Sequence, residues 1–372
     1  MRILVAGDFC PSYRVIEKFE NGNYPQVLGE VKPLLEQANY SIVNFECPVC
    51  YGGEIPIEKC GPNLRCTERG VESLKWVGFD CVTLANNHFL DYGEEGVRST
   101  LSACAKYGLD TVGGGVNINK ASSILYKEID GKRLAIINCC EHEFSIASER
   151  TAGSNPLNPI CQYYAIKEAK VNADYVLVIV HGGNEHFQLP SPRMQETYRF
   201  FVDTGADAVV NHHQHCYSGY EIYKKKPIFY GLGNFCFDDC NKRKTPWNEG
   251  YIVKLNLDKI VEFEIIPYIQ CDNRPIVTLM KDEECHSFKT QIEVLNAVIA
   301  DDVKLRASYT EYLDTTKKII KSVFEPYSGK LALALYRRGL LPSFVTEKKK
   351  RLLLAYIQCE SHISKILYYL KK

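Results

Sequence analysis

The sequence lacks any apolar run long enough to cross a bilayer. Its longest runs, such as Tyr175–Val180 and Leu352–Ile357, are far shorter than the roughly 20 residues that a transmembrane helix needs. The first residues also lack an apolar stretch followed by a small-residue cleavage site, and a strand-like pattern begins at Arg2. We therefore expect a cytoplasmic protein without a transmembrane segment.

The chain also lacks internal repeats, low-complexity segments and the dense cysteine pattern of small disulfide-bonded proteins. Its 372 residues are 45% hydrophobic and 24% charged, which excludes disordered, collagen-like and coiled-coil classes. The 16 cysteines are scattered, and the single CxxC pair, Cys47 and Cys50, has no second pair to complete a structural zinc site. We interpret the cysteines as reduced thiols of a folded protein with one large domain and an appendage, or with two domains.

The net charge is zero, but the charges are unevenly distributed along the chain. Residues 317–372 contain 13 Lys and Arg against 3 Asp and Glu, so this basic tail carries +10 and the rest of the chain −10. Apolar residues recur in the tail at helical spacing, at Leu353, Ile357, Ile363 and Leu367. We expect a helix that docks on the acidic body. An interfacial helix on an anionic membrane is the alternative, and no nucleic-acid partner is expected because the tail has no recognisable binding motif.

Short β-rich runs alternate with helical patterns up to about residue 272. Eight such runs lie at 2–6, 40–45, 81–85, 134–139, 175–180, 208–211, 227–230 and 251–256. Several are apolar at every position, as in strands covered on both faces, which predicts an α/β protein. The later runs, with a further one at 261–266, have no helix between them and predict an antiparallel part, hence mixed sheets. Helical periodicity then dominates, so we expect a first domain over 1–272 and a helical C-terminal region over 273–372.

Polar side chains cluster at or directly after the ends of five of these runs, where the loops of an α/β sheet converge. The clusters are Gly7–Asp8, Asn44–Glu46, Ala85–His88 with Asp91, His181–Glu185 and Asn211–His215. Carboxylate, carboxamide and imidazole groups together suit Mn, Fe or Zn, and a pair of such ions can clamp a displacement at phosphorus or carbon. In an extended segment, His213 and His215 point the same way and His212 points elsewhere. The sequence therefore predicts a divalent metal site.

The same elements resemble a known family over about residues 1–270. They are Gly-Asp at 7–8, Asn-Phe-Glu at 44–46, Leu-Ala-Asn-Asn-His-Phe-Leu-Asp-Tyr-Gly at 84–93, Gly-Gly-Gly at 113–115, His-Gly-Gly-Asn-Glu at 181–185, the run at 205–215 ending in His-His-Gln-His, and Tyr-Gly-Leu-Gly-Asn-Phe at 230–235. They look like the poly-γ-glutamate capsule biosynthesis protein family (CapA/PgsA), a branch of the calcineurin-like metallophosphoesterases. The resemblance implies a four-layer αββα sandwich with metals at one sheet edge, and the C-terminal helices are then an appendage.

The resemblance also implies roles for individual residues. The residues that match metal ligands, for one or two divalent ions, are Asp8, Glu46, Asn87, His181, His213 and His215. His88 matches the histidine that protonates the leaving group, Asp91 could orient its ring, and Glu185 could be a ligand, a base or a substrate contact. Cys10 stands where calcineurin-like phosphatases have a histidine, so the first metal site is expected to bind weakly or to use fewer ligands.

Two functions follow from this resemblance. The first is a metal-dependent hydrolase or transferase linked to capsule or poly-γ-glutamate synthesis, in which metal-activated hydroxide attacks a phosphoester or γ-glutamyl amide and His88 acts as the acid. Its substrate is a small molecule or a polymer, and substrate-contacting loops have no transferable code that would identify it. The second is a non-catalytic, metal-binding assembly component of a capsule or exopolymer synthesis complex.

Overall fold

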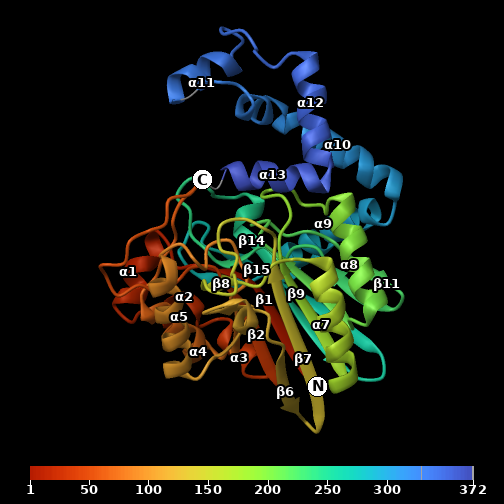
Figure 1. Ribbon diagram of the computed structural model, residues 1–372. Coiled ribbons are helices and arrows are strands. Elements are labelled where there is room, and N and C mark those ends of the chain that lie inside the picture. Colours follow the sequence, from red (N-terminus) through yellow and green to blue (C-terminus); the bar gives the residue numbers. More distant parts are fainter. Residues whose placement is uncertain (328, 371–372) are drawn as a thin grey trace. The chain divides into compact units, whose positions relative to one another are not determined.

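Two large β-sheets dominate the first 306 residues of the chain (Figure 1). This computed structural model describes residues 1–327 and 329–370. Its contacts divide into two compact units, Met1–Arg306 and Ala307–Lys372, each of which is described by itself.

The first sheet has its strands in the order β16-β15-β14-β1-β2-β3-β4, and β13 also pairs with β1. Strands β1 to β4 pair in parallel, whereas β14 is antiparallel to β1, and β15 and β16 continue the antiparallel part. The sheet is therefore mixed, with the antiparallel part where the sequence predicts it. The strands are β1 (Arg2–Phe9), β2 (Tyr40–Phe45), β3 (Cys81–Thr83), β4 (Asp110–Val112), β13 (Asn234–Cys236), β14 (Glu249–Leu257), β15 (Val261–Gln270) and β16 (Val277–Leu279).

The second sheet has the order β11-β12-β10-β9-β7-β6. Its central strands are parallel, and each edge strand is antiparallel to its neighbour. The strands are β6 (Leu125–Ile129), β7 (Lys132–Cys140), β9 (Tyr175–His181), β10 (Ala208–His212), β11 (Tyr220–Tyr223) and β12 (Lys226–Phe229). Two short strands, β5 (Gly114–Gly115) and β8 (Gly153–Ser154), form a separate pair.

Three buried apolar layers show how the sheets and helices stack. In β1, Ile3 and Val5 belong to the core between the two sheets, together with Ile136 and Leu177 of the second sheet. The alternate residue Leu4 faces the core under the N-terminal helices, because successive side chains of a strand point to opposite faces. A third core lies between the second sheet and helices α7 and α8. The order is helices, sheet, sheet, helices, so the predicted αββα sandwich is confirmed.

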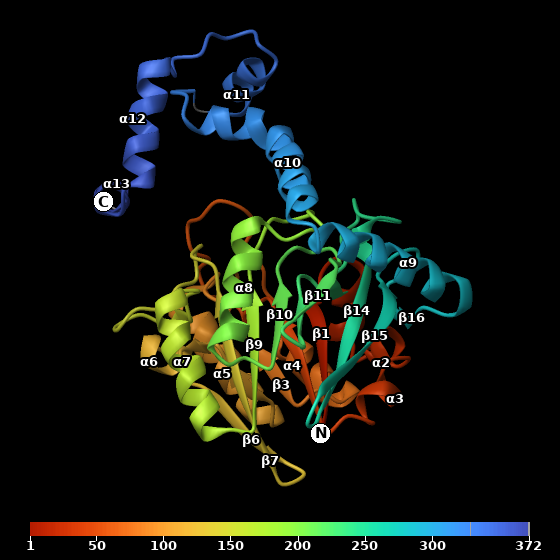
Figure 2. The same cartoon turned by 90° about the vertical axis from the view of Figure 1, so that its right-hand side faces the viewer.

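Helices cover both outer faces of this sandwich. Those over the first sheet lie together on one side of the strands in Figure 1, and α7 and α8 lie beside β9 and β10 in Figure 2. The first group comprises α1 (Arg14–Glu20), α2 (Pro25–Leu28), α3 (Lys32–Leu35), α4 (Glu68–Val77) and α5 (Gly93–Tyr107). The remaining elements of this region are α6 (Ile118–Ala121), α7 (Pro159–Asn172), α8 (Pro192–Thr204) and the short η1 (Pro246–Asn248).

The chain after residue 272 is helical apart from β16. Helix α9 (Asp282–Ile299) contributes Phe288 and Ile292 to the core between the sheets, so its packing belongs to the first unit. The domain boundary near residue 272 and the docking of the basic tail on the acidic body stay predictions.

The second unit contains most of α10 (Asp302–Val323), with α11 (Lys330–Arg337), α12 (Glu347–Gln358) and α13 (Glu360–Leu370). Within this unit, the buried carboxylate of Glu325 connects several segments. It accepts hydrogen bonds from the Phe344 backbone N–H at 2.8 Å, the Tyr336 hydroxyl at 3.0 Å and the Ser343 hydroxyl. Among the described residues, no helix combines the length and the apolar character needed to cross a membrane.

Candidate metal centre

Side chains from both sheets meet at the carboxyl ends of their parallel strands. The structure brings together the six predicted ligands: Asp8, Glu46 and Asn87, carried by β1 and by the segments after β2 and β3, and His181, His213 and His215, carried by β9 and the segment after β10. We call these six residues the ligand cluster. All six are buried, so the cluster lies inside the protein rather than on an open surface.

Close packing of the backbone places Asp8. The Asp8 N–H donates to the Gly233 carbonyl at 3.1 Å, and β13 pairs with β1 so that Asn234 lies opposite Asp8. At Gly7, a Cβ atom would lie 1.9 Å from the Gly233 carbonyl oxygen, so only glycine permits this approach. The Gly-Asp motif at 7–8 and the Gly-Asn-Phe motif at 233–235 therefore pack directly against each other.

The donor atoms of the ligand cluster lie within a few ångströms of one another. His181 Nε2 lies 3.1 Å from Asn87 Oδ1, 3.1 Å from His213 Nδ1 and 3.6 Å from Glu46 Oε1. His215 Nε2 lies 3.6 Å from the same Glu46 oxygen. Three overlapping groups have mutual donor distances within 4.8 Å: Glu46 with His181 and His213, Asp8 with Glu46 and His215, and Glu185 with His213 and His215. Each group could hold a metal ion.

Glu46 is the member of the ligand cluster whose buried carboxylate is least stabilised by its neighbours. Its side chain is completely buried, and neither carboxylate oxygen has a hydrogen-bond partner among the described residues. Burial, followed by the negative charge of Asp8, raises the pKa of Glu46 well above its ordinary value. A buried carboxylate with no donor is costly unless a positive charge joins it. The residue therefore fits a divalent cation.

The pKa values of the three histidines in the ligand cluster also suit metal binding. Burial is the largest cause that lowers the pKa of His181, His213 and His215 below the ordinary value, so these rings are neutral. Neutral imidazole is the form that binds a metal ion. Burial also acts to raise the pKa of Asp8, but its interactions with His212, His215 and Asn44 together outweigh burial and the net pKa is lowered. The site thus offers a carboxylate and neutral nitrogens in the forms that coordination requires.

The segment after β10 is not extended, which corrects one expectation. His213 and His215 both have left-handed backbone conformations, with φ of 90° and 54°. Their side chains converge because the backbone turns sharply at each residue, and not because they alternate along a strand. The expectation that His212 points elsewhere is also wrong: it ends β10, and its Nδ1 lies 3.2 Å from Asp8 Oδ1.

Two asparagines that the ligand prediction omits orient the cluster. Asn44 Nδ2 donates to Asp8 Oδ1 at 2.7 Å and lies 3.3 Å from His181 Nδ1. Asn234 Nδ2 faces the carbonyls of His215 and Trp247, so its oxygen must face His215 Nδ1, at 2.9 Å. That contact places the proton of His215 on Nδ1 and leaves Nε2 for an ion. Both asparagines lie in motifs quoted from the sequence.

A second group, which we call the His88 cluster, consists of Lys59, His88 and Asp91. His88 Nδ1 lies 2.7 Å from Asp91 Oδ2, as expected for a carboxylate that orients the ring. Lys59 is an addition that the sequence did not reveal: its ammonium forms an ion pair with Asp91 and lies 3.2 Å from His88 Nδ1. Lys59 lies in an irregular loop without periodicity, so no pattern marked it.

The remaining predicted residues differ in exposure. Glu185 is exposed, and a carboxylate oxygen lies within 4.8 Å of donors on His213 and His215. Cys10 packs instead in the core under the N-terminal helices, where it hydrogen-bonds the Cys47 thiol. Among the described residues, Cys10 belongs to none of the three groups that could hold an ion, so Glu185 is the additional group beside the six predicted ligands.

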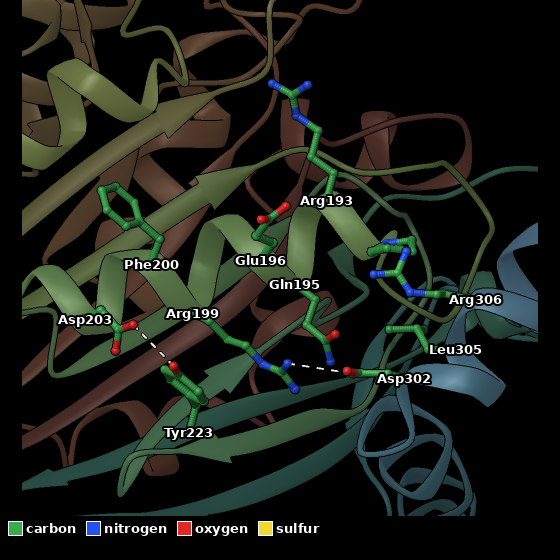
Figure 3. A pocket seen from close by; sticks show the side chains of 11 residues that line it. Arg193, Gln195, Glu196, Arg199, Phe200, Asp203, Tyr223, Asp302, Leu305 and Arg306 are labelled. Carbon is green, nitrogen blue, oxygen red and sulfur yellow. Dashed lines mark hydrogen bonds and ion pairs between the residues drawn. The ribbon is translucent and has the colours of Figure 1, made fainter.

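A separate pocket lies between α8, β11 and the start of α10, and contains no residue of either cluster (Figure 3). Its volume is about 600 Å³. Arg199 makes two hydrogen bonds to Glu221, at 2.9 and 2.7 Å, and lies 3.8 Å from Asp302, while Tyr223 donates to Asp203 at 3.2 Å. The charge of Arg199 in this pocket is therefore balanced by Glu221 and Asp302.

The fold and the ligand cluster define the class: a four-layer α/β sandwich with a candidate divalent-metal centre between the carboxyl ends of its two sheets. The sequence model of the family described as bacterial capsule synthesis protein PGA_cap matches residues 2–239, and the chain belongs to this family. The matched segment contains the whole ligand cluster and the whole His88 cluster. The family expected from the motifs is therefore confirmed.

Three named relatives are also similar to this chain in sequence. The chain is 34% identical over 246 residues to the capsule biosynthesis protein CapA of Bacillus anthracis, covering 64% of this chain and 60% of that protein. It is 33% identical over 260 residues to the PGA biosynthesis protein CapA of Bacillus subtilis (strain 168), covering 68% of each. A probable polyglutamine synthesis accessory protein of Mycobacterium tuberculosis is 27% identical over 227 residues, covering 56% of this chain and 59% of that protein. The match thus spans three fifths to about two thirds of their lengths.

Solved structures with a related arrangement are more distant. A 5'-nucleotidase precursor from Thermus thermophilus aligns with a TM-score of 0.41 and 10% identity, covering 87% of this chain and 60% of that one. A hypothetical protein from the same organism aligns with a TM-score of 0.45 and 16% identity, covering 72% and 99%.

Proposed function

We propose that this protein is a metal-dependent hydrolase or transferase of capsule or poly-γ-glutamate synthesis, acting on a phosphoester or a γ-glutamyl amide. The observation that carries the proposal is the buried carboxylate of Glu46, which lies beside neutral imidazoles and has no hydrogen-bond partner in the described part of the chain. A purely structural cluster would satisfy that carboxylate with hydrogen bonds. The names of the relatives support the biosynthetic setting.

One or two divalent ions, of Mn, Fe or Zn, would be held by the ligand cluster. Asp8, Glu46 and Asn87 supply oxygen donors, and His181, His213 and His215 supply nitrogen donors. When bound, such ions supply Lewis acidity and activate water. Glu185 lies on the exposed side, where it can complete an ion's coordination or contact a substrate.

His88 is the proposed proton donor to the leaving group. The contact of Nδ1 with Asp91 holds the ring in one orientation and directs Nε2 away from that carboxylate. His88 follows Asn87 directly, and after burial its charge is among the causes that lower the pKa of His181 and His213, so the ring lies near the ligand cluster. Proton donation by a positioned imidazole is worth about 10²- to 10⁴-fold in rate.

A cytoplasmic location belongs to the proposal. Its support is that Cys10, Cys47 and Cys236 are buried free thiols. Fractionation of cells that express the full protein, with a thiol-labelling readout, tests it: recovery in an oxidised, exported fraction would contradict it.

The decisive experiment is metal analysis followed by a substrate screen. Protein purified without chelator should contain at least one equivalent of a divalent metal. His213→Ala should lose it, while His286→Ala, which changes an exposed histidine of α9, should keep it. The loaded protein is then screened against phosphoester and γ-glutamyl substrates. Absence of metal from the parent, or equal metal in the His213 variant, would refute the proposal.

The second candidate is a non-catalytic, metal-binding component of a capsule-synthesis complex. Cys10 favours it, because the residue expected to be a histidine in a phosphatase faces the core instead. This function predicts metal binding without turnover in the screen, together with loss of polymer synthesis when the protein is deleted from its complex. Turnover that depends on His88 would exclude it.

A further inference from the structure

A lysine is buried beside the proposed proton donor. The Lys59 side chain is 2% exposed and that of Asp91 is completely buried. Lysine is almost never buried unless it is paired. Lys59 comes from the irregular segment between β2 and α4, whereas His88 and Asp91 follow β3, so the chain brings the ammonium group to this position from a different loop.

Asp91 is the centre of the His88 cluster. One carboxylate oxygen faces His88 Nδ1 at 2.7 Å and accepts from the Leu64 backbone N–H at 2.6 Å. The other oxygen pairs with the Lys59 ammonium. The Phe144 ring, with its centroid 5.1 Å from Lys59 Nζ, covers the ammonium. The carboxylate is therefore enclosed, and Lys59 supplies its balancing charge.

The same residue fixes the loop that carries Lys59. The Ile57 N–H donates to the Asp91 carbonyl at 2.9 Å, and Asn63 Nδ2 donates to the Ile57 carbonyl at 3.1 Å. With the Leu64 contact, residues 57–64 are fastened to Asp91 at both ends of the segment. Removing the ammonium would leave a buried charge that is no longer neutralised and would weaken this attachment.

We infer that Lys59 is a positioning residue for His88: by neutralising the enclosed Asp91 carboxylate and fastening residues 57–64 to it, Lys59 keeps the His88 ring in one orientation next to Asn87. Lys59 and Asp91 both approach Nδ1, so Nε2 is the nitrogen left for a substrate. The effect on turnover rests on the proposed function, whereas the effect on the ring and the loop does not.

The test compares Lys59→Met, which keeps length and removes charge, with Lys59→Arg, which keeps charge. Lys106→Met is the matched control, because Lys106 forms an exposed ion pair with Glu68. Hydrogen exchange of residues 57–64, the orientation of His88 in a crystal structure and Mn²⁺ affinity are measured for each. We expect faster exchange and a displaced ring in Lys59→Met alone, with Mn²⁺ affinity within about twofold of the parent because none of the ligands changes. A parent-like ring and loop in Lys59→Met would overturn the inference.

Kinetics with Mn²⁺ and diphenyl phosphate, whose phenolate is a poor leaving group that benefits from a proton donor, distinguish a positioning role of Lys59 from an effect on stability alone. Lys59→Met should lower kcat by about 10-fold or more with little change in KM, and Lys59→Arg should recover most of it. In a His88→Ala background the same change should have almost no further effect, because Lys59 acts through His88. Additive losses would overturn the inference.

Failure of the proposed role of His88 and failure of the inference about Lys59 give different results. If the parent binds Mn²⁺ but His88→Ala does not change turnover, the proposed role of His88 fails, and the crystal and exchange data still decide the effect of Lys59 on the ring. If Lys59→Met does not fold, Lys59→Gln, which retains a hydrogen-bond donor without charge, replaces it in every measurement, and a parent-like ring there overturns the inference.

Discussion

Two groups of polar side chains meet at the Asn87–His88 peptide bond and balance their charges in opposite ways. In the ligand cluster, Glu46 is buried with no donor to its oxygens among the described residues, and the three histidines are neutral. In the His88 cluster, the Asp91 carboxylate has its own cation in Lys59. The first arrangement is complete only with an added cation, whereas the second is complete by itself. The two adjacent groups therefore differ in whether an added cation is needed to balance their buried carboxylate.

The largest effect should follow from removing the unpartnered charge. Glu46→Gln should weaken Mn²⁺ binding by about 100-fold or more, because a ligand oxygen loses its charge. The metal-free variant should be no less stable than the parent, since the buried carboxylate has no hydrogen bond to lose within the described part of the chain. Calorimetric titration and thermal unfolding with and without Mn²⁺ measure both quantities. A variant that is clearly destabilised without metal would show that Glu46 has a structural partner.

Breaking the second cluster should change turnover and leave metal binding intact. His88→Ala should reduce turnover of a confirmed substrate by about 10²-fold or more, the loss expected for a positioned proton donor. Metal content, measured by elemental analysis, should equal that of the parent. Equal turnover in variant and parent would refute the role of His88, and loss of metal would show that the two clusters are not separate.

A smaller effect is expected at the asparagine that orients one ligand. Asn234→Ala removes the acceptor that holds the proton of His215 on Nδ1. Mn²⁺ affinity should fall by about 10-fold, as for other groups that orient metal-binding histidines. Asn184→Ala, which changes a half-buried asparagine near Glu185, is the control. Equal affinities in the two variants would mean that the contact does not set the tautomer.

The most gradual effect is the dependence of metal affinity on pH. The pKa of Glu46 is raised well above its ordinary 4.5, so a proton on this side chain competes with the ion. Metal binding then releases protons, and affinity should rise with pH by at most about tenfold per unit for each proton released. The lowered pKa values of the histidines shift their competing protonation to below the ordinary 6.5. Titrations in buffers of different ionisation enthalpy should show proton release in the parent and less in Glu46→Gln.

The stability of the metal-free protein follows the same pKa shifts with a definite sign. The raised pKa of Glu46 means that its protonation stabilises the folded state fully below the ordinary 4.5, and that this contribution is lost as pH rises through the folded pKa. The lowered pKa of His181 acts in the other direction, because its stabilising effect is present above the ordinary 6.5 and is lost as pH falls through its folded pKa.

Much of the fold was predictable because its strands carry a local pattern. Residues 176–180 are apolar at each position and form part of β9, which is buried on both faces. The division of the strands into two sheets had no such local signal and came from the family resemblance. Pairing is long-range: Arg2 of β1 lies opposite Asn256 of β14, and nothing in either segment specifies that partner.

The candidate site was predictable to the extent that its residues lie at strand ends. That position marks Glu46 and His181 as candidates, and the family resemblance assigns them as ligands. The convergence of His213 and His215 was expected from an extended segment that does not exist. The sharp turns at His213 and His215 could not be read from the sequence, because no spacing of residues marks them, and the contact of His212 with Asp8 was missed as well. Lys59 was missed because its loop is held by single contacts to Asp91 instead of a repeating pattern.

The ligand cluster draws half of its residues from each sheet, and this has a mechanical consequence. Asp8 and His215 are separated in sequence by most of the first unit. An ion bound by both would cross-link the two sheets of the sandwich. Because the unfolded chain cannot keep these ligands together, each tenfold increase of free metal above its Kd would add about 1.4 kcal/mol to the free energy of unfolding. The concentration of free metal would then set how stable the folded protein is.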